Sequence, residues 1–419
     1  MPLEKFIIEG GRPISGRVEV SGAKNAVLPI MCAGILAEGE YTVDNAPRLR
    51  DVDHMGLVLR ELGVRVERED HRLKVDSTGL AGNVAPYELI RKMRAGIYVL
   101  GPLLARTGRA RVSLPGGCAW GPRPVDLHVS GLRALGVRIE LNHGYIDASC
   151  DRLKGALIRH QRPSVGATCN IMMAAVLAQG TTTIENAARE PEVVALADFL
   201  ISMGADISGA GSHRLQIQGV KTLQPAGVRV IPDRIEAGTF MALAALTGGP
   251  IQLDFVHQRH LTAIARALEA TGCLIEFEDD RATIRRDDPI RPVDVDTEPF
   301  PGFPTDMQAQ LTALMTIADG ESRITDTIYG DRFTHAPELS RLGADITVED
   351  NVARVRGVKK LSGASLMATD LRASAALVLA GLVAEGETEI RRVYHIDRGY
   401  ESIEDKLRKL GARIRREQE

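Results

Sequence analysis

The chain has 419 residues, and the 44% that are hydrophobic are enough for two or three domains with sizeable cores. Its 52 basic residues nearly balance 55 acidic ones and aromatic residues make up only 4%, so we do not expect a nucleic-acid binder. The longest uncharged stretch, Ser164–Ile184, contains too many polar residues for a membrane span. The five cysteines form no Cys-x-x-Cys pair and Met1–Lys5 lacks the basic start of a secretory signal, so a cytosolic enzyme without a disulfide framework is expected.

A short phrase of apolar residues, a glycine and a small residue recurs along the chain, once in degenerate form. Each copy ends a helical pattern, where glycine suits a helix C-cap because it tolerates positive φ. The glycines follow one another at steps of 68 to 73 residues: Gly63, Gly136, Gly204, Gly272, Gly343 and Gly411. A second phrase, in which a glycine separates an apolar helix from a strand, recurs with the same period, so the sequence predicts six repeats.

Each repeat is expected to hold two helices with strands between and after them. Helix interiors such as Ile171–Leu177 are apolar almost all round, which is typical of buried helices. We therefore predict an α/β fold of two domains, each with three pseudo-repeats of about 70 residues, buried helices and outer sheets. The strand pattern Phe6–Val20 has no earlier partner and is expected to complete the last repeat, giving domains of residues 22–231 and of residues 1–21 plus 232–419.

The first segment with chemical potential is Ser21–Asn25, between a strand pattern and a helix. Backbone amides at a helix N-terminus, with Lys24 beside them, suit an anion. The spacing is not that of a Walker A loop, and a solvated lysine in a turn is the more ordinary interpretation.

The second segment is the loop Leu114–Asp126, rich in glycine and proline, which carries Cys118 and, five residues later, Arg123. A nearby cation lowers a thiol pKa and favours a reactive thiolate. The alternative is an inert cysteine that acts as a small apolar residue. No histidine pattern beside it supports a papain-like triad.

The third segment ends at Asp306, just before the expected helix Met307–Met315. An aspartate at or near the N-cap explains this pattern without any catalytic role. As a base, Asp306 would need a hydroxyl substrate beside it.

Three late turns carry arginines, in Asp331–Phe333, Thr369–Arg372 and His395–Tyr400. Arginine clusters bind phosphate and carboxylate, although each of these alone is explained by a surface ion pair. They occupy similar places in successive repeats, so they could converge. The ten histidines offer no convincing metal site, and no Gly-x-Gly-x-x-Gly or Gly-x-Ser-x-Gly motif occurs.

Taken together, these segments resemble the UDP-N-acetylglucosamine 1-carboxyvinyltransferases, the enolpyruvyl transferases that begin bacterial peptidoglycan precursor synthesis. The resemblance covers essentially the full length. Its motifs are Ser21–Ala26, Arg91–Arg106, Pro115–Cys118, Arg123–His128, Ser164–Thr168, Pro304–Gln310, Thr369–Ala375 and His395–Glu401. The resemblance implies an inside-out α/β barrel of two domains with three repeats each.

The resemblance also implies the reaction: the enolpyruvyl group of phosphoenolpyruvate moves to the 3-hydroxyl of UDP-N-acetylglucosamine, and phosphate is released by addition and elimination. Cys118 matches the loop cysteine that protonates the methylene carbon and can bond phosphoenolpyruvate covalently. Asp306 matches the carboxylate that faces the 3-hydroxyl. Lys24 and Arg398 complete the expected catalytic set. No metal or other cofactor is expected, since lysine and arginines can supply the charge.

Further residues match the family's substrate contacts. Lys24 and Asn25 match the phosphoenolpyruvate and sugar end, and Arg94 matches a substrate-binding arginine. The two nucleotide segments are Arg123, Pro124, Val125, Asp126 and Leu127, and Arg162, Pro163, Ser164 and Val165. Ile328 matches a UDP-sugar contact. The expected cationic clamp and its neighbour are Arg332, Asp370, Arg372 and Arg398.

Trp120, Pro122 and Arg162 depart from the residues common in the family, but none removes a group that the mechanism needs. Two alternatives remain open. A 3-phosphoshikimate 1-carboxyvinyltransferase would lack the loop Pro115–Cys118 and the nucleotide segment. A non-catalytic UDP-sugar-binding homologue is disfavoured by the intact catalytic set.

Overall fold

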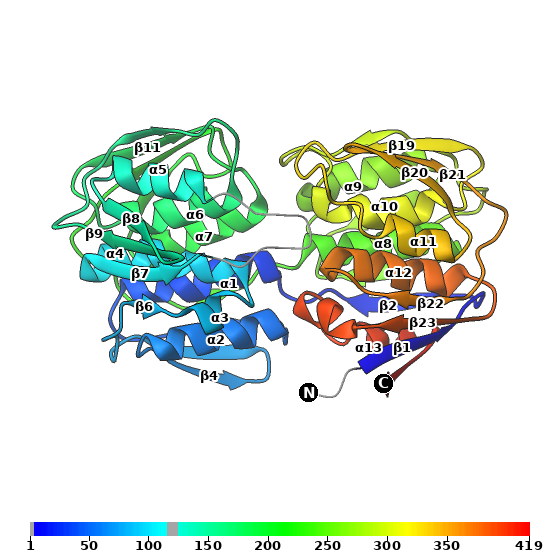
Figure 1. The fold of residues 1–419 in the computed structure, drawn as a ribbon, viewed down its shortest axis with the longest axis horizontal. Coiled ribbons are helices and arrows are strands. Elements are labelled where there is room, and N and C mark those ends of the chain that lie inside the picture. Colours follow the sequence, from blue (N-terminus) through cyan, green and yellow to red (C-terminus); the bar gives the residue numbers. More distant parts are fainter. Residues whose placement is uncertain (1–3, 115–124) are drawn as a thin grey trace. The chain divides into compact units, whose positions relative to one another are not determined.

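The structure is a computed structural model that describes residues 4–114 and 125–419. The chain forms two compact units (Figure 1). One is Gly22–Ile231, called the continuous unit below. The other combines the start of the chain up to Ser21 with Pro232–Glu419, and is called the composite unit.

Three four-stranded sheets surround the continuous unit. The first has the order β14 (Val228–Arg229), β3 (Glu40–Asp44), β5 (Arg72–Asp76) and β4 (Arg65–Glu69). The second has β6 (Val84–Ala85), β7 (Arg109–Ser113), β9 (Tyr145–Ser149) and β8 (Arg138–Asn142). The third has β10 (Leu157–Arg159), β11 (Thr181–Glu185), β13 (Arg214–Gln218) and β12 (Asp206–Ser208). In each sheet the first pair is parallel and the others are antiparallel.

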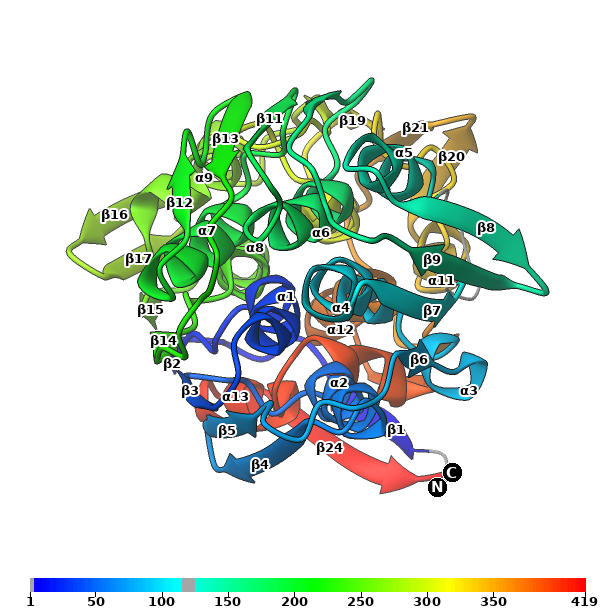
Figure 2. The same cartoon turned by 90° about the vertical axis from the view of Figure 1, so that its left-hand side faces the viewer.

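The centre of this unit is helical. Its inner helices are α1 (Lys24–Ala33), α4 (Leu100–Thr107) and α6 (Val165–Ala175), which lie side by side in Figure 2. In α6 every residue from Ala167 to Ala175 is buried, because the helix is mostly apolar on every side and its polar residues Thr168 and Asn170 are buried as well. The outer helices are α2 (Arg50–Glu61), α5 (Asp126–Ala134) and α7 (Pro191–Ser202). Short helices complete it: η1 (Gly34–Leu36), α3 (Tyr87–Ile90) and η2 (Arg94–Val99).

The composite unit repeats the same plan. The first sheet has the order β2 (Gly16–Glu19), β15 (Ile251–Asp254), β17 (Arg281–Arg285) and β16 (Leu274–Glu278). The second has β18 (Val295–Asp296), β19 (Glu321–Thr325), β21 (Val352–Arg356) and β20 (Asp345–Glu349). The third has β22 (Ser365–Met367), β23 (Glu387–Arg391), β1 (Glu4–Glu9) and β24 (Arg413–Gln418). The first strand of the chain, β1, thus lies between β23 and β24, so both ends of the chain share one sheet.

Helices again fill the centre of the composite unit. The inner ones are α8 (Arg234–Thr247), α10 (Gln308–Met315) and α12 (Leu371–Val383). The outer ones are α9 (Gln258–Ala270), α11 (Ala336–Arg341) and α13 (Ile403–Lys409), and the 3₁₀ turns are η3 (Thr305–Met307) and η4 (Val393–Arg398). In the described residues, six equivalent sheets around buried helices confirm the predicted inside-out α/β architecture and its six repeats. The repeated glycines that end the outer helices all have φ between 89° and 104°. No helix in the described ranges is long and apolar enough to cross a bilayer.

Two repeats depart from the common plan. In the other four, the residue after the central strand is left-handed, with φ of 57° to 59°: Asn45, Asn186, Phe255 and Arg392. After β3, β11 and β15 the outer helix begins within a few residues, whereas residues 392–402, which include η4, separate β23 from α13. After β7 and β19, residues 114–125 and 326–335 separate the strand from α5 and α11. Candidate site residues from the sequence lie in both of these segments, and residues 115–124 of the first lie outside the described residues.

Candidate active site

Asp306 is held by two arginines of the composite unit. Arg332 Nη1 lies 2.8 Å from Asp306 Oδ1, and Arg372 Nη2 donates to Asp306 Oδ2 at 3.0 Å. The two guanidinium side chains are only 7% and 3% exposed, whereas the carboxylate is 26% exposed. The interpretation of these arginines as surface ion pairs is therefore wrong for Arg332 and Arg372. The two buried guanidinium groups hold the Asp306 carboxylate where it is partly exposed to solvent.

The local geometry of Asp306 also differs from the expectation. We expected it at or near the N-cap of a helix starting at Met307, but it lies inside the 3₁₀ turn η3, whose N-cap is Pro304, and α10 starts at Gln308. No side-chain cap bond is formed at either N-cap. Neither Pro304 nor Met307 has a side chain that can cap a helix, and the two oxygens of Asp306 are bound by guanidinium groups instead.

The arginines set the charge of this group. Burial alone would raise the pKa of Asp306, but the positive charges of Arg372 and Arg332 outweigh burial and hold the pKa well below its ordinary value. In return, although burial acts the other way, the carboxylate raises the pKa of Arg372. Asp306 is thus an anion at any physiological pH, and an acceptor of hydrogen bonds.

Asp370 fixes the position of Arg372. It is the N-cap of α12, and its Oδ1 accepts from the backbone N–H groups of Arg372 at 2.9 Å and Ala373 at 3.1 Å. Its Oδ2 accepts from the Thr334 hydroxyl at 2.8 Å. One carboxylate therefore ties the start of α12 to the loop that carries Arg332.

Arg398 ends the turn η4, which packs against α12. It is half-buried, and its charge adds to the effect of burial, which lowers the pKa of His395 to about 4. The ring of Tyr400, two residues later, lies with its centroid 5.5 Å from Arg372 Cζ. The structure thus brings Arg332 and Arg372 together at Asp306, and places Arg398 on the neighbouring turn.

In the continuous unit, Lys24 is the first residue of α1 and is buried. Its Nζ lies 2.7 Å from Oδ2 of Asp51, a buried carboxylate in the first turn of α2. The interpretation of Lys24 as a solvated lysine is therefore wrong. Sequence reasoning missed Asp51, because an acidic residue in the first turn of a helix is ordinary. Asn25 follows in α1 and is half-buried.

The two expected nucleotide segments meet in the continuous unit. Arg162 Nη2 donates to Asp126 Oδ1 at 3.2 Å, across 36 residues of sequence. Both side chains are about half exposed, so this pair contributes little stability and is easily exchanged. The remaining described members are Val125, Leu127, Pro163, Ser164 and Val165. Cys118, Arg123 and Pro124 lie outside the described residues.

Ser164 is the N-cap of α6 and accepts from the Ala167 N–H at 3.3 Å. This cap starts α6 directly after Arg162 and Pro163, so a nucleotide segment is anchored to a buried helix.

A buried polar network that the sequence analysis missed joins these segments. Asn170, in the apolar helix α6, donates to the Ile97 carbonyl at 2.9 Å and lies 3.1 Å from His128 Nδ1. Its Oδ1 accepts from the Gly101 N–H at 2.6 Å. Burial, helped by His160, lowers the pKa of His128 to about 4, so this histidine is neutral. The network links α5 and α6 to η2, which Arg94 begins. An asparagine within an otherwise apolar helix was the available signal.

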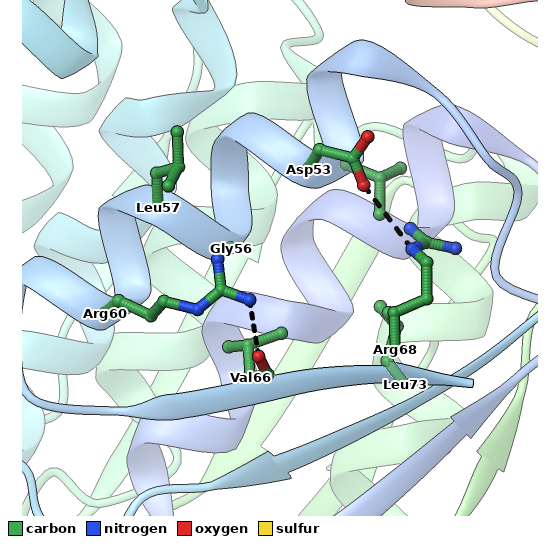
Figure 3. A pocket seen from close by; sticks show the side chains of 8 residues that line it. Asp53, Gly56, Leu57, Arg60, Val66, Arg68 and Leu73 are labelled. Atoms are coloured by element: carbon green, nitrogen blue, oxygen red, sulfur yellow. Dashed lines mark hydrogen bonds and ion pairs between the residues drawn. The ribbon is translucent and has the colours of Figure 1, made fainter. Parts of the chain in front are cut away.

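A cavity of about 240 Å³ lies beside α2 and is separate from these groups (Figure 3). Its walls include Val52, Leu57 and Val66, and none of the candidate residues lines it. At its edges, Arg60 donates to the Val66 carbonyl and Arg68 pairs with Asp53 at 3.4 Å. These arginines are already satisfied by the protein, so the cavity presents no set of groups for a ligand.

The chain is similar to enolpyruvyl transferases over its whole length. The family model for EPSP synthase (3-phosphoshikimate 1-carboxyvinyltransferase) matches residues 8–407. A UDP-N-acetylglucosamine 1-carboxyvinyltransferase of Desulfatibacillum aliphaticivorans is 54% identical over 414 residues, which cover 99% of this chain and 100% of that protein. The same-named protein of Chloroherpeton thalassium is 55% identical over 418 residues, covering 99% and 97%.

Solved structures agree with this. The enolpyruvyl transferase NikO from Streptomyces tendae superposes with a TM-score of 0.90 and 28% identity, covering 100% of both chains. An EPSP synthase from Acinetobacter baumannii superposes with a TM-score of 0.77 at 18% identity, covering 99% of this chain and 100% of that one. That second likeness supports the fold alone.

Proposed function

The chain belongs to the EPSP synthase family of enolpyruvyl transferases, and from this premise we propose that it transfers the enolpyruvyl group of phosphoenolpyruvate to the 3-hydroxyl of UDP-N-acetylglucosamine. The reaction releases phosphate and starts peptidoglycan precursor synthesis. The observation that carries the choice of acceptor is the full-length identity of about 54% to relatives named for this reaction. The two EPSP synthase structures, at 18% and 19% identity, support the fold and not the choice of acceptor.

We assign to Asp306 the task of orienting the 3-hydroxyl and accepting its proton as the new C–O bond forms. The fixed carboxylate between Arg332 and Arg372 supports this assignment, because two buried guanidinium groups leave it a single orientation. Its low pKa makes it a weak base, so proton transfer has to accompany attack on phosphoenolpyruvate rather than precede it. Cys118 delivers the proton that the methylene carbon gains in the same addition.

Phosphoenolpyruvate carries a phosphate and a carboxylate, and its addition and elimination need fixed positive charge. We assign this charge to Lys24, Arg398 and the two arginines of the Asp306 cluster. The burial of Lys24 supports the assignment, since a cation partly removed from water interacts more strongly with an anion. The Asp51 carboxylate keeps that ammonium charged and in place.

The nucleotide part of the acceptor is assigned to the segments around Asp126 and Arg162, and to Ile328. The exposed pair between Asp126 and Arg162 supports this, because a nucleotide can displace it at little cost. We propose that the reaction takes place in the cytoplasm, and cell fractionation with an antibody to the protein tests this.

Phosphate release separates the possible acceptors. The purified protein is incubated with phosphoenolpyruvate and either UDP-N-acetylglucosamine or shikimate 3-phosphate, and phosphate is measured over time. We expect phosphate release when UDP-N-acetylglucosamine is the acceptor and none when shikimate 3-phosphate is the acceptor. The nucleotide sugar should gain the mass of an enolpyruvyl group. Release with shikimate 3-phosphate instead would reverse the assignment. Binding of UDP-N-acetylglucosamine without any phosphate release would support a non-catalytic homologue.

A further inference from the structure

Asp326 is a buried carboxylate that none of the assignments above uses. It follows β19 directly and is 1% exposed. Its Oδ1 accepts from the backbone N–H groups of Ile328 at 3.0 Å and Tyr329 at 2.8 Å. The same oxygen accepts from the Thr297 hydroxyl at 3.0 Å. Its Oδ2 accepts from the Thr305 hydroxyl at 2.6 Å. These four donors are all neutral, and together they satisfy both oxygens of the anion.

Thr305 connects Asp326 to Arg332 through two hydrogen bonds. Its hydroxyl has one proton, which it gives to Asp326, so its lone pairs are left to accept from elsewhere. Arg332 Nη1 donates to Thr305 Oγ1 at 3.0 Å and lies 2.8 Å from Asp306 Oδ1. Nη1 of Arg332 is therefore held by Asp306 directly and by Asp326 through the Thr305 hydroxyl.

The turn after β19 is built differently from its counterparts in the same unit. Where Phe255 and Arg392 follow their strands with φ of 58° and 59°, Asp326 has no left-handed φ. Its side chain closes the turn instead, through the two backbone bonds to Ile328 and Tyr329. The segment 326–335 begins at this turn, leads to α11 and contains Arg332 (β19 and α11 in Figure 1).

We propose that Asp326 is a positioning residue that sets two parts of the active site at once. One part is the turn with Ile328, which holds the UDP-sugar. The other is the Arg332 guanidinium beside Asp306, which Asp326 reaches through Thr305. The inference rests on the proposed function and deepens it, since it identifies the group that couples acceptor binding to the orientation of the carboxylate.

Two substitutions separate the two parts. Thr305→Val keeps the shape of the side chain and removes the hydroxyl that joins Asp326 to Arg332, while the bonds of Asp326 to Ile328 and Tyr329 remain. It should lower kcat by about tenfold and leave KM for UDP-N-acetylglucosamine within about twofold. Asp326→Asn puts an NH2 group against the Thr305 hydroxyl and weakens the turn. It should lower kcat by at least as much and also raise KM for UDP-N-acetylglucosamine by about tenfold. Thr305→Ser is the matched control: it keeps the hydroxyl, and its kcat should lie within about twofold of the parent value.

The double variant tests whether both residues act through one link. The proposal requires that Thr305 orients Arg332 only while Asp326 holds its hydroxyl, so the combination should have the kcat of Asp326→Asn alone. Losses that multiply would overturn the proposal. So would an unchanged kcat in Thr305→Val, or an unchanged KM for the nucleotide sugar in Asp326→Asn. If Asp326→Asn does not fold, the comparison of Thr305→Val with Thr305→Ser still decides the link to Arg332.

Asp254→Asn is a matched control for stability. Asp254 is the last residue of β15, in another repeat of the composite unit. It is 3% exposed and forms ion pairs with the surface residues Arg17 and Arg281. This variant should lower Tm as Asp326→Asn does and leave kcat and KM within about twofold. If activity in all variants simply followed Tm, Asp326 would be structural only and the inference would fail. A parent enzyme that releases no phosphate would refute the proposed function itself, which is a separate result.

Discussion

The most informative single change is Asp306→Asn, because it keeps the shape of the side chain and removes its charge. Asparagine has one oxygen, so it can still accept from one guanidinium group. Its NH2 group then faces the other guanidinium, donor against donor. Arg332 and Arg372, which are 7% and 3% exposed, lose the anion that their present positions require.

The size of both effects follows from this geometry. One charge-assisted hydrogen bond is worth about 1.5–3 kcal/mol, and removing one partner of a buried ion pair costs about 3–5 kcal/mol. Since Asp306 is 26% exposed, water offsets part of that cost, and we expect a loss of about 2–4 kcal/mol in the free energy of unfolding. Loss of the proton acceptor should lower kcat by about 100-fold or more. Binding of UDP-N-acetylglucosamine should change only a few-fold.

The assays are phosphate release for kcat, calorimetry for nucleotide-sugar binding and urea unfolding for stability. The control is Asp296→Asn in the same repeat, where an exposed pair with Arg323 at 3.5 Å should be worth less than about 1 kcal/mol. A fall in kcat of less than about tenfold would refute the role of Asp306 as proton acceptor. Equal stability of the Asp306 variant and the parent would refute the view that the two ion pairs stabilise the fold.

The stability difference should also depend on pH in one direction. The folded pKa of Asp306 lies below its unfolded value of about 3.9, so its stabilisation is fully present above that value. It is lost as pH falls toward the folded pKa. The difference between the parent and Asp306→Asn should therefore be constant from about pH 8 to about pH 5 and shrink below about pH 4. A difference that grew on acidification would contradict the sign of this shift.

Three further changes test other parts of the molecule. Arg398→Ala should raise KM for phosphoenolpyruvate by more than it raises KM for the nucleotide sugar, and equal increases would remove Arg398 from the anion site. An epoxide phosphonate such as fosfomycin should alkylate Cys118, faster with UDP-sugar present, and Cys118→Asp should stay active and resist it; peptide mapping that found another modified cysteine would refute this. The other cysteines should be spared because burial raises the pKa of their thiols: Cys32, Cys150, Cys169 and Cys273. Gly56→Ala in α2 should raise Tm by about 2 °C, because glycine costs about 1 kcal/mol in a helix and the new methyl group would lie 3.7 Å from its nearest neighbours. A lower Tm would show that the cavity wall cannot accept the methyl group.

Local patterns in the sequence were enough to determine the architecture. The repeated glycines were visible because a helix that ends in the left-handed conformation favours glycine whatever surrounds it, and each has the expected positive φ. The buried helices were visible because a helix covered on all sides has no polar face, as in α6. The count of six repeats follows from these signals alone.

The partners of the candidate residues were decided by the tertiary structure. Asp306 meets an arginine 66 residues later, and Lys24 meets a carboxylate that looked like an ordinary first-turn residue of α2. Asp326 gave no signal, since an aspartate after a strand usually marks only a turn. Sequence patterns report local backbone preference and burial, whereas the choice of a charged partner depends on which ends of different repeats come together. In the folded unit the carboxylate of Asp306 lies close to Arg332 and Arg372. Both arginines are shielded from water there, so the ion pairs are strong enough to fix the orientation of the carboxylate.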